Sequence, residues 1–198
     1  MRTALFILAS ASAFAFTAQA ANAQDFTGPR VEVTAGYDTT NADDGIAGTP
    51  NKLDGARIGG AIGYDVALGD TFRIGAEADA GFLVSGDNRY AAGTSNYHVT
   101  TGRDLGLSVR AGAKVGDRTF LYAKGGWANS QYRVRAVIGG ATGPTSTDLR
   151  SNEDGWRIGA GVEHMVTDKI YAKAEYRYTN YGSDVSRHQL LAGVGYRF

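Results

Sequence analysis

The stretch His188-Gln-Leu-Leu-Ala-Gly-Val-Gly-Tyr-Arg-Phe198 decides the fold. Successive residues of a strand face opposite sides, so an extended segment here has two unlike faces. The first face carries His188, Leu190, Ala192, Val194, Tyr196 and Phe198. The second carries Gln189, Leu191, Gly193, Gly195 and Arg197. The first face needs an apolar surrounding, which is either a protein core or lipid hydrocarbon.

Seven further segments repeat the same alternation with a period of two residues. They are 30–38, 56–68, 71–84, 103–115, 120 to about 134, 156–166 and 170–181. All are of about the same length, and the fifth loses its phase near Ser130. No sustained helical spacing of apolar residues accompanies them. The chain is therefore predicted to be all-β, with eight strands in antiparallel, up-and-down order.

The connections between these segments alternate between short and long. Residues 69–70, 116–118 and 167–169 have the composition of tight turns. Longer polar connections are expected at 39–55, 85–102, about 135–155 and 182–187. Short turns at one end and long loops at the other are typical of transmembrane β-barrels. An even number of strands also returns both termini to the turn end.

The central positions of the apolar faces carry no Lys, Arg, Asp or Glu in any of the eight segments. The opposite faces carry Glu32 and Asp65 and a set predicted to form a charge network in the barrel lumen. This set is Arg57, Arg73, Glu77, Asp79, Arg110, Lys114, Lys124, Arg157, Glu163, Lys173, Glu175, Arg177 and Arg197. A lipid-facing cation at mid-membrane costs about 2–4 kcal/mol, which explains such exclusion.

The strands of a soluble β-sandwich with one solvent-exposed face would also alternate between apolar and polar residues, so this fold is the alternative to a membrane barrel. The apolar faces are rich in Ala and Gly, which give too little volume for a close-packed core. Many of the 28 glycines fall on the charged faces, where they make room inside a narrow barrel. Aromatic residues cluster near the strand ends, as in membrane-interface girdles. These features favour a transmembrane β-barrel.

Residues 1–23 are predicted to be a cleaved export signal. Arg2 precedes an apolar run at 4–16, which is too short for a spanning helix. Ala21-Asn-Ala23 fits the cleavage pattern, and Ala18-Gln-Ala20 is the alternative site. Residues 24–198 then form one barrel domain. The chain has no cysteine. Its 20 basic and 20 acidic residues give no net positive charge of the kind that indicates nucleic-acid binding.

Three segments resemble the small eight-stranded outer-membrane barrels of Gram-negative bacteria, the opacity-type and OmpA-like porin family. They are Leu121-Tyr-Ala-Lys-Gly-Gly-Trp127, Tyr171-Ala-Lys-Ala-Glu-Tyr-Arg-Tyr178 and Leu191-Ala-Gly-Val-Gly-Tyr-Arg-Phe198. The resemblance implies an outer-membrane location with periplasmic termini, among lipids and lipopolysaccharide. It also implies that Val194, Tyr196 and Phe198 are the signal read by the barrel assembly machinery.

A structural role at the envelope surface is the expected function, because an eight-stranded barrel is filled by its own side chains. The lumen charges are expected to pair as a plug. The alternatives are a narrow solute pathway with slight anion preference, and an adhesin that binds a ligand through its long loops. No cofactor or metal site is expected, since the three His are isolated.

Two local motifs leave further alternatives open. Ser186, His188 and the nearby Asp184 form a weak pattern for a lipid A-modifying enzyme, with polar rim residues as the ordinary interpretation. The basic segment Tyr132-Arg-Val-Arg135 is either a contact for lipopolysaccharide phosphates or part of an extended hairpin arm.

Overall fold

The computed structural model describes residues 25–42, 52–85, 88–92, 95–140, 143–182 and 185–198. The export signal predicted at 1–23 lies outside these residues. The described strands are β1 (Gly28–Ala42), β2 (Lys52–Leu68), β3 (Phe72–Leu83), β4 (Asn88–Ala92), β5 (Ser95–Val115), β6 (Thr119–Gly140), β7 (Gly143–Met165), β8 (Ile170–Asn180) and β9 (Val185–Arg197).

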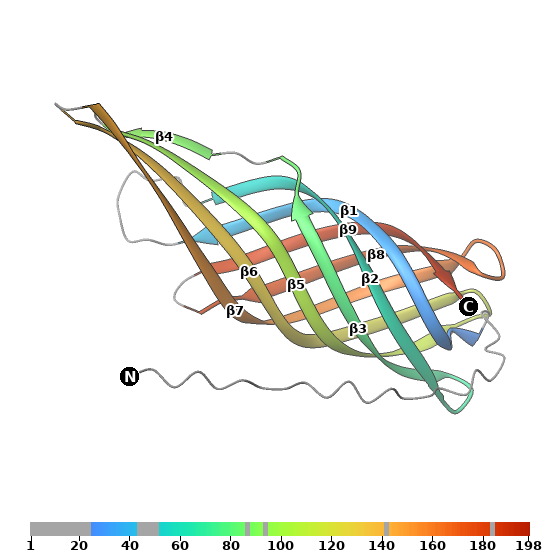
Figure 1. Cartoon of the computed structure of the whole chain (residues 1–198). Coiled ribbons are helices and arrows are strands. Elements are labelled where there is room, and N and C mark those ends of the chain that lie inside the picture. The colour runs from blue at the N-terminus through green and yellow to red at the C-terminus, as the bar shows by residue number, and fades with distance from the viewer. Residues whose placement is uncertain (1–24, 43–51, 86–87, 93–94, 141–142, 183–184) are drawn as a thin grey trace.

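These strands form one antiparallel sheet in the order β3-β2-β1-β9-β8-β7-β6-β5-β4. An additional pairing of β3 with β5, from Phe72↔Ala113 to Phe82↔Arg103, closes the sheet into a barrel. The barrel wall therefore contains eight strands, and β4 pairs only with the outer part of β5 (Figure 1). The predicted eight-stranded up-and-down barrel is confirmed.

Alternating burial shows which side of each strand faces inward. Along β5, the side chains of Leu107 and Val109 are 59% and 58% exposed, whereas Ser108 between them is 6% exposed. In the other strands of the wall, charged residues are likewise buried and apolar residues are exposed, such as Val33 with an exposed fraction of 67% and Ile62 with 63%. The wall is thus apolar outside and charged inside, which is the reverse of a water-soluble domain.

The strands differ in length, which corrects the prediction of eight similar segments. β8 has 11 residues, whereas β7 has 23. Most of the connections predicted at 85–102 and 135–155 are strand, because β5, β6 and β7 continue outward past the barrel (Figure 1). Polar residues dominate this continuation, so the apolar alternation that reveals a membrane strand stops before the strand does.

The tight turns gather at the other end of the barrel, next to the C-terminus (Figure 1). Gly69 and Gly116 occupy left-handed backbone conformations there, with φ of 73° and 70°, which glycine adopts without a Cβ clash. Within the described ranges, no helix is long and apolar enough to cross a membrane.

Candidate functional site: the charged lumen

The barrel interior is filled by ionisable side chains rather than by a hydrophobic core. Among the described residues, ten Arg or Lys and eight Asp or Glu are buried. Burying a charge without a partner costs several kcal/mol, so these groups must satisfy one another. Their contacts form three tiers along the barrel axis, which we call the inner, middle and outer tiers, counted from the turn end.

The inner tier contains Arg30, Asp65, Arg110, Glu163 and Arg197. Arg110 donates two parallel hydrogen bonds to Asp65, of 2.7 and 2.5 Å. It also donates to Glu163. Arg197 bridges the same two carboxylates, at 2.9 and 2.6 Å. Since Arg30 also donates to Asp65 at 3.2 Å, one carboxylate is held by three guanidinium groups.

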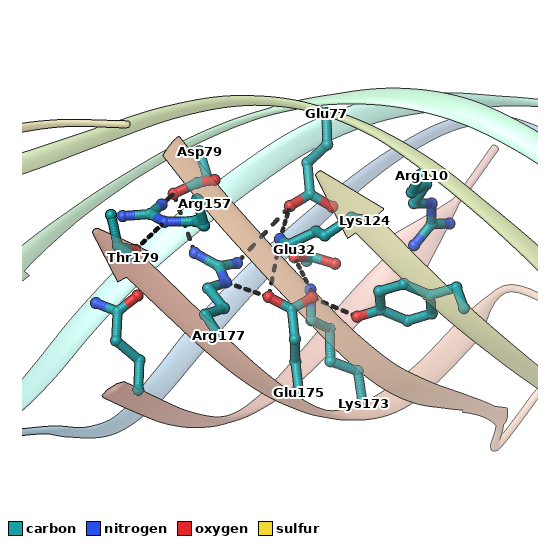
Figure 2. A network of polar contacts seen from close by, with 12 residues as sticks. Glu32, Glu77, Asp79, Arg110, Lys124, Arg157, Lys173, Glu175, Arg177 and Thr179 are labelled. Atoms are coloured by element: carbon teal, nitrogen blue, oxygen red, sulfur yellow. Dashed lines mark hydrogen bonds and ion pairs between the residues drawn. The ribbon is translucent and has the colours of Figure 1, made fainter. Parts of the chain in front are cut away.

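The middle tier is formed by Glu32, Glu77, Lys124, Lys173 and Glu175, which come from β1, β3, β6 and β8 (Figure 2). The Lys124 ammonium lies 2.5 Å from Glu77 and 2.8 Å from Glu175. The Lys173 ammonium lies 2.5 Å from Glu32 and 3.1 Å from Glu175. Each ammonium thus bridges two carboxylates, and the tier alone carries one negative charge more than positive.

Two arginines from outside the middle tier compensate its excess negative charge. Arg30 donates to Glu77 at 2.6 Å and to Glu32 at 3.1 Å. Arg177 donates to Glu175 and also to Asp79 of the outer tier, the latter at 3.0 Å. Figure 2 shows Arg177 between these two carboxylates. The tiers are therefore one connected network rather than three separate clusters.

The outer tier is built around Asp79 and Asp104. Arg157 donates to Asp79 at 3.1 Å and to both oxygens of Asp104 at 2.8 Å. Arg57 donates to Asp104 at 3.0 Å and lies 3.5 Å from Asp38. The Arg187 guanidinium adds a third cation, 3.7 Å from Asp104.

An aromatic floor closes the turn end below the inner tier. Its buried residues are Phe26, Phe120, Tyr122, Met165 and Tyr171. The Phe26 and Phe120 rings stack with centroids 5.4 Å apart. Arg197 lies 5.4 Å over the Phe26 ring and 5.2 Å over the Tyr171 ring. Cation–π contacts therefore join the floor to the charge network.

Glycines on the inner face provide the space that this network occupies. A Cβ at Gly81 would overlap the Arg57 guanidinium. A Cβ at Gly106 would lie 2.5 Å from Asp79 and 2.8 Å from Arg157. Such distances are shorter than any ordinary contact. The prediction that these glycines make room inside the barrel is confirmed at both positions.

The structure brings most of the predicted lumen residues together, with two placed apart from the tiers. Arg73 donates to three backbone carbonyls, of Asp25, Gly69 and Phe72. Lys114 is part-buried and lies 3.1 Å from the Asp25 carboxylate. Both residues hold the segment before β1 against the turn end.

Four network residues were missing from the sequence prediction: Arg30, Asp38, Asp104 and Arg187. The residue number of each differs by an even number from that of a predicted inward-facing residue on the same strand. Parity alone could have found them. Arg30, Asp38 and Asp104 lie at the ends of predicted segments, and Arg187 lies one residue before the predicted last strand.

The outer surface carries the remaining sequence candidates. Val194 and Phe198 are exposed on the exterior, and the Phe198 ring packs edge-on against Tyr196 with centroids 5.0 Å apart. His188 is half-buried on the exterior, where its Nδ1 lies 2.6 Å from the Tyr176 hydroxyl. Asp184, the carboxylate of the enzyme alternative, lies outside the described residues. The described part of the chain holds no group of three residues that could bind a metal ion.

This arrangement pairs the charged groups of the described lumen with one another, while a few buried oxygens, among them Oδ1 of Asp79 and Oε1 of Gln189, have no hydrogen-bond partner. Guanidinium and ammonium groups contact carboxylates at every level from the aromatic floor to Arg187. The network can cross-link the eight strands from within, and it occupies the path that a solute would take.

Sequence and structure comparisons agree with this geometry. A 25 kDa outer-membrane immunogenic protein of Brucella ovis is 28% identical over 147 residues, which cover 74% of this chain and 66% of that protein. The chain thus spans just under two thirds of that relative's length.

Two solved structures show the same fold. Neisserial surface protein A superposes with a TM-score of 0.56 at 20% identity, covering 87% of this chain and 98% of that one. The attachment invasion locus protein Ail of Yersinia pestis, solved with the heparin analogue sucrose octasulfate, gives 0.55 at 15% identity, covering 86% and 99%.

The model of the outer membrane protein beta-barrel domain matches residues 6–198. With its apolar wall, filled lumen and eight-stranded closure, the chain belongs to this family and is a protein of the outer membrane.

Proposed function

We propose that this protein is a non-enzymatic structural barrel of the envelope surface, whose lumen is closed to solutes. The observation that carries this proposal is the continuous ion-pair network across the barrel. Asp65, Glu77 and Asp104 each contact at least two cations from other strands. A solute could pass only by displacing several buried pairs at once, and each pair is costly to break.

We also propose how the barrel is exported and assembled. Residues 1–23 are removed on export, and the turn end and both termini lie in the periplasm. Val194, Tyr196 and Phe198 form the signal for the assembly machinery, which the exposure of Val194 and Phe198 on the outer wall supports. An enzymatic role is not proposed: the Nδ1 of His188 is hydrogen-bonded to the Tyr176 hydroxyl rather than to a described carboxylate.

Conductance measurements test the closed lumen. Purified full-length protein is reconstituted into planar bilayers under an applied voltage. We expect the membrane current to stay at its baseline, with at most rare and brief openings. A large, steady conductance would contradict the plug and favour the solute-pathway alternative.

Surface binding is the second candidate function. Its specific support is the outward continuation of β5, β6 and β7, a sheet well beyond what barrel closure requires. The structure of Ail with a heparin analogue is a precedent for a ligand on this fold. If removal of this sheet abolished ligand or cell binding while the barrel stayed folded, the second candidate would be favoured.

A further inference from the structure

The segment before the first strand does not continue the barrel wall. It consists of Asp25, Phe26 and Thr27, which we call the strap. Phe26 and Gly28 both occupy left-handed backbone conformations, with φ of 53° and 88°. Such φ values interrupt an extended chain, so the strap leaves the line of β1.

The strap is bound by strands on the far side of the turn end. Arg73 of β3 donates to the Asp25 carbonyl oxygen at 2.5 Å, and the Lys114 ammonium of β5 lies 3.1 Å from the Asp25 carboxylate. The Phe26 ring stacks on Phe120 of β6, with centroids 5.4 Å apart. In the closed order of eight wall strands, β6 lies opposite β1. The strap therefore crosses the mouth of the lumen.

Phe26 is the part of the strap that reaches into the lumen. Its exposed fraction is 0%, although it belongs to none of the wall strands. The Arg197 guanidinium of the inner tier lies 5.4 Å over the same ring. One side chain of the strap thus contacts both the aromatic floor and the first ion pairs above it.

The other rings of the floor are fixed in the barrel wall. Three of them lie so close to a glycine that an added Cβ would overlap the ring: Phe120 at Gly112, Tyr122 at Gly161 and Tyr171 at Gly195. These three rings belong to β6 and β8, whose strands are hydrogen-bonded on both sides. Phe26 differs from them, because only the strap connects it to the wall.

Two features favour release of the strap. A left-handed φ is unfavourable for a residue with a Cβ, so Phe26 is strained while its ring is seated. The charged anchor is also partly open to water, since the Lys114 and Asp25 side chains are 20% and 50% exposed. Exposed ion pairs contribute little to stability. Burial of one ring and the Arg73 hydrogen bond must therefore offset the strain.

We propose that the strap is a releasable seal at the turn end of the lumen, with Phe26 as its stopper. While the ring is seated, it keeps water at the turn end away from the floor and from Arg197. When the strap is released, these groups meet solvent and the ion-pair network stays in place. This inference rests on the closed lumen proposed above and gives that lumen a second seal, separate from the network.

Thiol labelling measures the release, because the chain has no cysteine of its own. Met165 belongs to the floor and is 1% exposed, so Met165→Cys introduces a single buried thiol there. The full-length variant in detergent is treated with a charged, water-soluble methanethiosulfonate reagent. We expect slow labelling whose rate stays constant in urea below the unfolding transition, since release of three residues exposes little surface.

Phe26→Ala, added to Met165→Cys, removes the stopper. We expect labelling to become at least about tenfold faster, because the floor is then open locally while the barrel stays folded. Phe82→Ala is the matched control, since Phe82 is 57% exposed on the outer wall, and it should leave the labelling rate unchanged. Lys114→Gln removes only the charged anchor and leaves the apolar floor intact, so it should accelerate labelling about two- to fivefold.

Three results would overturn the releasable seal. The first is an unchanged labelling rate in both Phe26→Ala and Lys114→Gln. The second is an equal acceleration by Phe82→Ala. The third is labelling of the Met165→Cys protein that rises with urea in step with unfolding, which would make the strap a fixed part of the fold.

Bilayer recordings separate this inference from the closed lumen itself. Baseline current in the unmodified protein, together with fast labelling in the Phe26→Ala variant, would support both. Steady conductance of the unmodified protein would remove the closed lumen, and the second seal with it. Baseline current with unchanged labelling in both strap variants would remove the strap alone.

Discussion

At the scale of single residues, Asp65 shows how the barrel interior is stabilised. Arg30, Arg110 and Arg197 all donate hydrogen bonds to its carboxylate, and all four side chains are almost fully buried. Strand parity places these residues on the inner face from sequence alone. Which residues pair across the barrel depends on strand stagger and side-chain length, so the sequence does not predict the pairs.

Asp65→Asn should destabilise the barrel strongly. Removing this charge leaves three buried guanidinium groups short of a counterion, and breaking a buried pair costs about 3–5 kcal/mol. The free energy of unfolding in urea, measured in lipid vesicles, checks this. Asp117→Asn in the exposed turn is the control, expected to change stability by less than about 0.5 kcal/mol. Equal effects of the two changes would show that the network does not stabilise the fold.

At the scale of strands, the sequence predicts the segments that form the barrel wall. It does not predict how far some of these strands continue beyond the wall. Within the bilayer, one face meets hydrocarbon and the other meets the lumen, so composition alternates strictly. Beyond Ser130 the apolar alternation disappears from the sequence, although β6 continues to Gly140. A register shift between Thr101 and Asp104 of β5 also falls at this level, where the alternation changes phase.

The last strand allows assembly to be separated from stability. Phe198 lies at the turn end of the outer wall, 54% exposed, and its ring packs edge-on against the Tyr196 ring. If Phe198 is read by the assembly machinery, Phe198→Ala should lower the amount of folded barrel in cells severalfold. Refolding of the same variant from urea into detergent should match the wild type. A refolding defect as large as the cellular one would instead make Phe198 a structural residue.

At the scale of the whole molecule, one chain combines an apolar outer wall, a charged lumen and strands β5, β6 and β7 that continue past the barrel. The segregation of charge to one face of every strand is visible in the sequence, and it suffices to predict a membrane barrel. The position of β4 and the length of β5, β6 and β7 beyond the barrel depend on pairing between polar segments. No hydrophobic pattern specifies that pairing, so it could not be read from the sequence.

The central claim is that the apolar faces contact lipid while the charged faces contact one another. Photolabelling of the unmodified protein by lipids with a reactive group in the acyl chain tests it most directly. Mass spectrometry should find labels on Val33, Leu107 and Val109, which face outward, and none on Ser108 or Lys124, which face the lumen. Labels on Ser108 and Lys124, with Leu107 and Val109 unlabelled, would contradict the account.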